Sequence, residues 1–86
     1  MNPRPVPGWT GRDSGDECLF RDSDGERIHV LNATAREIYL LCDGSRSTDE
    51  VALEMANRYT VDQSTARTNV DEIVEALVGL GILAPG

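Results

Sequence analysis

Residues 30–44 read VLNATAREIYLLCDG, and this stretch decides the fold. Asn32 is a good helix N-cap, because its side-chain oxygen can accept a hydrogen bond from a backbone N–H of the first turn. Glycine often ends a helix just past its last residue, and Gly44 stands at that place. Between the two, apolar side chains recur at helical spacing at Ala35, Ile38, Tyr39, Leu41 and Cys42. The stretch therefore predicts a strand end, a cap, a helix and a stop.

A β-hairpin is predicted immediately before this helix. Its strands are residues 17–21 and 27–31, and its turn is residues 22–26, where Asp24-Gly25 tolerates positive φ. Side chains alternate along a strand, so Ile28 and Val30 share one face while His29 and Leu31 share the other. Both faces of the second strand thus carry an apolar side chain against which a peptide can pack.

The chain divides into an N-terminal arm and one folded domain. Residues 1–8 hold three of the four prolines and predict a flexible, extended arm. Residues 9–86 form the domain, with Trp9 pinning the end of the arm to it. Eighty-six residues can bury only one modest core, which favours a single binding surface over a multi-domain enzyme.

Two further helices follow. Ser47 and Glu50 form a capping box that opens a helix running to about Tyr59. A longer helix is predicted from about Gln63 to Leu80, and Gly81 stops it. The adjacent aliphatic residues 82–83 should fold back on the core, since they are costly to leave exposed.

Charge and cysteine content exclude several classes of protein. A net charge of −7 repels nucleic acid and anionic lipid headgroups. No apolar run is long enough to span a membrane, and residues 1–7 lack the apolar stretch of a secretory signal, which places the protein in the cytoplasm. Cys18 and Cys42 do not make a metal set, and we expect both to be free, buried thiols.

No catalytic site is predicted. His29 lies within a strand, and no motif places a nucleophile beside it. The acidic runs 13–17 and 22–26 lack the spacing of a calcium loop, and no glycine-rich loop can hold phosphates. We therefore expect a non-enzymatic protein without a metal or cofactor.

Strands followed by three helices also suit a winged helix-turn-helix, so a small winged-helix transcription regulator is the alternative hypothesis. Its electrostatics are unfavourable, since the third helix and its start carry several carboxylates against the single cation Arg67: Asp62, Asp71, Glu72 and Glu75. The basic footprint of a DNA-binding helix is missing. The architecture can match that of a DNA-binding protein while the ligand does not.

Residues 30–44 resemble the Leu-Asn-x-Thr-Ala…Ile…Leu-Cys-Asp-Gly signature of the PqqD family, and the resemblance extends over about residues 17–84. It implies an α+β, winged helix-turn-helix-like fold, in which an N-terminal antiparallel sheet of two or three strands precedes three helices. The sequence departs from the family pattern before Glu17, so the number of strands stays open.

The resemblance also implies a function. Such a domain binds the leader segment of a ribosomally made precursor peptide and presents it to a modifying enzyme. That enzyme is a radical S-adenosylmethionine enzyme of the pyrroloquinoline quinone type, a lasso-peptide protease or another enzyme that modifies ribosomally made peptides. An exposed strand edge can accept an extended peptide as one more strand, with the third helix as a second wall. The expected peptide-binding residues are Arg27, Ile28, His29, Val30, Leu31, Asn69, Glu72, Ile73 and Ala76. A monomer and a homodimer are both compatible with the sequence.

Overall fold

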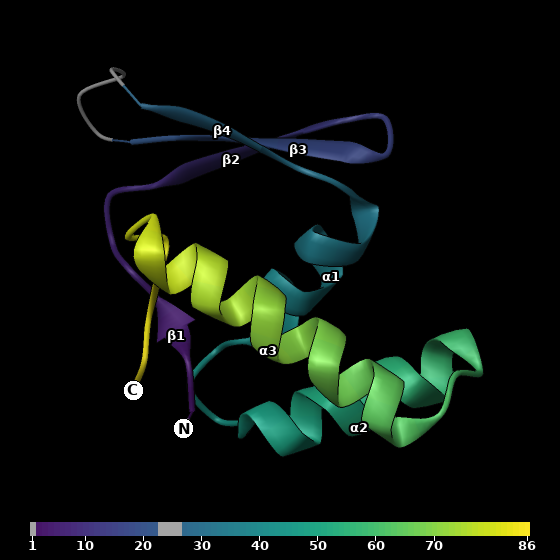
Figure 1. Cartoon of the computed structure of the whole chain (residues 1–86). Coiled ribbons are helices and arrows are strands. Elements are labelled where there is room, and N and C mark those ends of the chain that lie inside the picture. Colours follow the sequence, from purple (N-terminus) through teal and green to yellow (C-terminus); the bar gives the residue numbers. More distant parts are fainter. Residues whose placement is uncertain (1, 23–26) are drawn as a thin grey trace.

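Strands precede helices in the computed structural model, which describes residues 2–22 and 27–86 (Figure 1). The fold is α+β, as predicted. Its elements in chain order are β1 (Arg4–Pro5), β2 (Thr10–Ser14), β3 (Glu17–Arg21), β4 (Ile28–Leu31), α1 (Ala33–Leu41), α2 (Thr48–Tyr59), α3 (Gln63–Gly79) and β5 (Leu83–Ala84). Apart from Asp22, the predicted turn at residues 22–26 lies outside the described residues, as does Met1.

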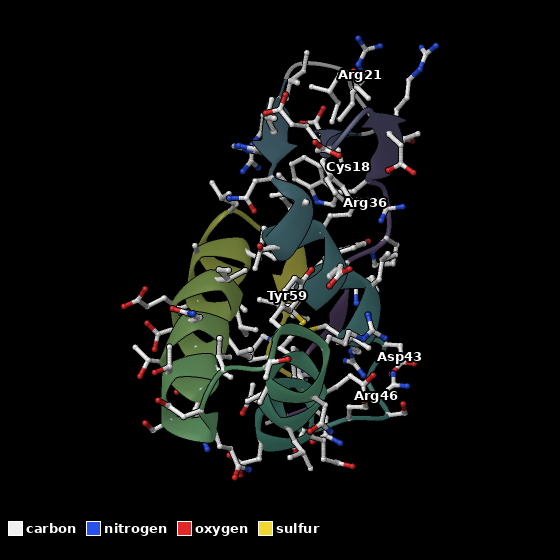
Figure 2. All side chains as sticks on the ribbon, turned by 90° about the vertical axis from the view of Figure 1, so that its right-hand side faces the viewer. Cys18, Arg21, Arg36, Asp43, Arg46 and Tyr59 are labelled. Carbon is white, nitrogen blue, oxygen red and sulfur yellow. The ribbon has the colours of Figure 1, made fainter. Side chains whose placement is uncertain are left out.

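The main sheet has three antiparallel strands in the order β2-β3-β4. The sequence left two or three strands possible, and the structure has three. One face of the sheet is turned toward the helices, where Cys18, Phe20 and Leu31 are buried. Arg36 of α1 binds the carboxylate of Asp13 on β2 through two hydrogen bonds, of 2.7 and 2.9 Å. Figure 2 shows Arg36 beneath Cys18, where the sheet meets the helices.

Each helix begins at a side-chain cap. The Asn32 side chain accepts from the Ala35 N–H at 2.8 Å. Ser47 and Glu50 form the predicted capping box, with donor–acceptor distances of 3.1 and 3.0 Å. Asp62 caps α3 by accepting from the Thr65 N–H at 2.7 Å. At its other end α1 stops at Cys42, and Gly44 has the positive φ, 89°, that favours glycine there.

The core lies between the sheet and the three helices. Its most buried side chains include Ile38, Val51, Val70, Val74 and Ile82. Cys18 and Cys42 are both free and buried, as predicted. The aliphatic pair at residues 82–83 is also buried, which confirms that the chain folds back after α3.

The N-terminal arm pairs with the end of the chain. In the small antiparallel sheet β1-β5, Arg4 lies opposite Ala84 and Pro5 opposite Leu83. The Val6 N–H donates to the Ile82 carbonyl at 2.9 Å. Figure 1 shows the two chain ends side by side, away from the main sheet. The flexibility of the arm stays a prediction.

The end of the arm is pinned as predicted. Trp9 donates from Nε1 to the Gly81 carbonyl oxygen at 2.8 Å, which joins the arm to the turn after α3. Among the described residues, α1, α2 and α3 are all too short or too polar to cross a bilayer.

Candidate functional site

One edge of β4 is open. β3 pairs with β4 on one side, and no other described strand pairs with it. The Asp22 N–H donates to the Arg27 carbonyl at 3.1 Å, so these two residues form a hydrogen-bonded pair at the start of the ladder. Hydrogen-bonded and non-hydrogen-bonded pairs alternate along an antiparallel ladder. The register then makes Arg21↔Ile28 and Leu19↔Val30 the non-bonded pairs. It follows that Ile28 and Val30 direct their N–H and C=O groups away from β3, toward the open edge.

Helix α3 runs beside this strand in the opposite direction. At one end, the Nη2 of Arg27 donates to the Leu80 carbonyl oxygen at 2.6 Å. At the other end, Thr34, just after β4, and Asn69 of α3 line the same small cavity of about 170 Å³. Asn69, Ile73, Ala76 and Leu80 follow one another at steps of four, three and four residues, so they form one stripe along the helix. The two ends of this stripe, Asn69 and Leu80, lie beside Thr34 and Arg27 at the two ends of β4, and we call the stripe the wall of α3.

A cluster of side chains joins the start of β4 to the end of α3. The Arg27 guanidinium lies 5.4 Å from the centre of the Trp9 ring. The Trp9 and His29 rings lie 5.6 Å apart at their centroids. A cation at the C-terminus of a helix is favourable, because the free carbonyls there carry partial negative charge. Arg27, Trp9 and Leu80 thus close one end of the space between strand and helix.

His29 turns toward the interior and is only partly exposed. Its Nε2 atom is buried and has no hydrogen-bond partner among the described residues. Leu31, two residues further on, points to the same side and is 6% exposed. The inner face of β4 therefore offers the core one apolar side chain and one polar ring.

The predicted site residues differ in exposure. Ile28 and Val30 are 53% and 54% exposed. Leu31 is core, and Ile73 is partly buried against the core. The exposed members on α3 are Asn69, Glu72 and Ala76. The structure joins the two sets at Arg27, which bonds to Leu80 at the end of α3, while Leu31 and Ile73 also serve the core.

Sequence reasoning missed two parts of this site. It predicted that Trp9 holds the arm, but not that its ring contacts Arg27 and His29, because these contacts join residues about twenty positions apart. It also missed Thr34 and the cavity beside Asn69, which form only when α1, α2 and α3 pack. No local sequence pattern marks either feature.

The two cysteines of the core are held in their neutral form. Burial raises the pKa of the Cys42 thiol to about 11, and burial also raises the pKa of Cys18, so both thiols are protonated near neutral pH. Within residues 2–22 and 27–86, no three His, Cys, Asp or Glu side chains lie together as a metal site would require. The site can give a ligand main-chain hydrogen bonds from β4, apolar contacts from Ile73 and Ala76, and polar contacts from Asn69 and Glu72.

A family model described as coenzyme PQQ synthesis protein D (PqqD) matches residues 18–83. A curated protein of Rhodopseudomonas palustris (strain BisB5), named PqqA binding protein, is 34% identical over 58 residues. That match covers 67% of this chain and 57% of the relative, so the chain spans little more than half of the relative's length.

Two solved structures share the whole fold. TbiB1 in complex with the TbiA(beta) leader peptide has a TM-score of 0.82 and 17% identity, and the match covers 96% of each chain. A lasso peptide synthetase B1 complexed with the leader peptide has a TM-score of 0.84 and 21% identity, with 99% of this chain and 100% of the other covered. At these identities the likeness establishes the fold alone.

Proposed function

This chain belongs to the PqqD family, and we propose that it is a peptide chaperone without chemistry of its own. It binds the leader segment of a ribosomally synthesised precursor peptide by strand addition and presents it to a modifying enzyme. The open edge of β4 carries the proposal, because Ile28 and Val30 have main-chain groups that no described strand satisfies. The name of the curated relative and the leader peptides in the two solved complexes support it.

The added peptide lies as a further strand between the edge of β4 and the wall of α3. Its main chain bonds to Ile28 and Val30, and its inward side chains meet Ile73 and Ala76. The small Ala76 leaves room for them, and the partly buried Ile73 gives them an apolar surface. Arg27 and Trp9 mark one end of the groove and Asn69 the other. Main-chain bonds supply affinity, while these side chains supply selectivity.

Glu72 gives the groove its charge preference. It is exposed on α3 beside Ala76, and it makes no ion pair with any described residue. A carboxylate there favours a leader segment with a basic side chain at the matching position. The enzyme that receives the peptide is a radical S-adenosylmethionine enzyme of the pyrroloquinoline quinone type, a lasso-peptide protease or another enzyme that modifies ribosomally made peptides, and the exchange takes place in the cytoplasm.

The test is isothermal titration of the chain with synthetic leader segments from short reading frames next to its gene. We expect micromolar or tighter binding, on the order of 8 kcal/mol. Val30→Pro removes the outward N–H at a place where proline is tolerated, on an open strand edge. It should weaken binding by about tenfold or more, while Val30→Ala, which keeps the N–H, stays within a few-fold of the original affinity.

Circular dichroism and a thermal melt establish that both variants remain folded. Equal binding by the proline and alanine variants would rule out strand addition at β4. If the unaltered chain did not bind the leader segments, the proposed chaperone function would be contradicted. In that case a gel shift that appears at low salt and vanishes at higher salt would support the winged-helix regulator.

A further inference from the structure

The face of the main sheet that is turned away from the helices carries an uncovered apolar patch. Side chains alternate along β3, so Cys18 and Phe20 point inward while Leu19 and its neighbours at positions 17 and 21 are exposed. The register places Leu19 directly opposite Val30 on β4, and Ile28 lies next along the same face. These three aliphatic side chains are 37%, 54% and 53% exposed. They form a continuous patch across the two strands.

Two arginines border this patch. Arg12 lies opposite Leu19, and Arg21 lies opposite Thr10 and Ile28. A hollow of about 480 Å³ is lined by residues of all three strands, namely Thr10, Arg12, Leu19, Arg21 and Ile28. Figure 2 shows Arg21 at the end of the molecule formed by the sheet, far from the helices. We call this surface, residues 10, 12, 19, 21, 28 and 30, the outer sheet face.

The charge of the outer sheet face is opposite to that of the protein. The whole chain has a net charge of −7. Four arginines are paired with carboxylates, at Arg36, Arg46, Arg58 and Arg67. Arg12 and Arg21, by contrast, make no ion pair within the described part of the chain. An aliphatic centre with arginines around it is typical of protein interfaces, where arginine is enriched and lysine depleted.

The outer sheet face also adjoins the groove. A strand added to β4 projects every second side chain to the same side as Ile28 and Val30. Those side chains enlarge the apolar patch when the leader peptide is bound. A protein that docks here therefore touches the chain and the outward side chains of its peptide at once.

We propose that the outer sheet face is the docking surface for the modifying enzyme, which meets it with aliphatic side chains flanked by carboxylates. This inference rests on the proposed peptide-chaperone function. A second copy of the chain fits the face less well, since two copies would bring four arginines together with only the two Glu17 carboxylates, at the start of β3 beside the face, to offset them. An enzyme with an acidic rim satisfies both arginines.

The experiment uses the full chain and the purified modifying enzyme encoded beside its gene, with and without the leader peptide. The double variant Arg12→Gln/Arg21→Gln should bind the enzyme about tenfold more weakly than the unaltered chain. The control Arg46→Gln/Arg58→Gln changes the net charge equally at a distant place and should stay within about twofold. Leu19→Ser tests the aliphatic centre in the same way. Its control is Leu53→Ser, which replaces another exposed leucine, on α2.

Leader titration of the same variants separates this inference from the proposed function. All four variants should bind the leader peptide as the unaltered chain does, because none alters the edge of β4 or the wall of α3. The docking surface would be overturned if the outer-face variants and their controls lost enzyme affinity equally, or if neither lost any. If the variant Arg12→Gln/Arg21→Gln changed the monomer–dimer equilibrium, the proposal would also be overturned, and the face would be a contact between two copies of the chain. If the unaltered chain fails to bind the leader, the proposed function fails, whatever the enzyme does.

Discussion

Glu72 and Glu75 show how two like residues on one helix come to differ in role. Both are exposed on α3, but helical spacing places Glu72 next to the stripe of Asn69, Ile73 and Ala76 and places Glu75 further round the helix, away from that stripe. Helical geometry decides this, because positions 69, 73, 76 and 80 follow the strand and position 72 is next to them. A carboxylate beside the groove can meet a peptide, and one on the far side cannot.

Glu72→Gln should therefore weaken binding of a leader segment with a basic residue by about two- to fivefold, the effect of one exposed charge pair. Glu75→Gln is the matched control and should leave the affinity unchanged. Titration at low and high salt checks the cause, since the difference between the two variants should shrink as salt screens the pair. Equal losses in both variants would contradict a local contact at Glu72.

Cys42 makes stability depend on pH at the alkaline end. Burial raises the pKa of its thiol from 9.0 for an accessible cysteine to about 11. The unfolded thiol ionises first as pH rises, so the stabilisation is fully present below pH 9 and is lost as pH approaches 11. We expect a loss on the order of 2 kcal/mol across that range. Urea denaturation at three pH values checks this, and Cys42→Ala should show a smaller fall.

For β4, some properties of single residues can be predicted from the sequence and others cannot. The alternation of Ile28 and Val30 with His29 and Leu31 is readable from the sequence, and the structure confirms it. Which of these residues point their main-chain groups to the open edge depends on the register with β3, which no sequence pattern fixes. The buried, unpartnered Nε2 of His29 is likewise a product of packing against Trp9.

At the scale of elements, the three helices were predictable because each has apolar side chains at helical spacing and at least one end signal. These signals are Asn32 and Gly44 for α1, the Ser47–Glu50 capping box for α2 and Gly81 for α3. The short strands lack such signals. β2 has five exposed residues and no apolar alternation, since its inner face carries Gly11 and Asp13. β1 and β5 have two residues each, too few for a pattern, and their pairing joins residues about eighty positions apart. Local signals thus define the helices, whereas tertiary contacts define three of the five strands.

The capping box of α2 is the clearest local signal, and its loss should be measurable. Ser47→Ala removes the acceptor for the Glu50 N–H and should lower the free energy of unfolding by about 1 kcal/mol. Ser45→Ala, in the loop before the helix, is the control and should change it by less than about 0.5 kcal/mol. Urea denaturation measures both. Similar values for the two variants would show that tertiary packing alone holds the start of α2.

At the scale of the whole molecule, the arm and the chain end act as one unit. Pro3 is buried, its carbonyl accepts from the Gly44 N–H at 3.0 Å, and β1 pairs with β5. The arm thereby touches the end of α1 and the last strand. Trp9, which follows the arm, is the residue that contacts Arg27 and His29 of the groove. We therefore expect residues 2–8 to contribute to stability and to leave the peptide site unaltered.

Replacing residues 2–8 with a glycine-serine segment of equal length should lower the free energy of unfolding by about 2 kcal/mol. Leader-peptide affinity should stay within twofold wherever the variant is folded. A thermal melt and a titration measure the two effects. A stability change below about 0.5 kcal/mol would instead support the flexible arm that the sequence predicts.

The adjacency of the two chain ends has a topological consequence. Gly86 lies so close to Asn2 that a side chain at position 86 would collide with the Asn2 carbonyl. Ends this close can be bridged by a few residues, so we expect the domain to tolerate circular permutation and insertion into a surface loop of a host protein. The strand edge and the outer sheet face would remain accessible in such a chimera. The same architecture can therefore serve as a free module or as a cassette within a larger polypeptide.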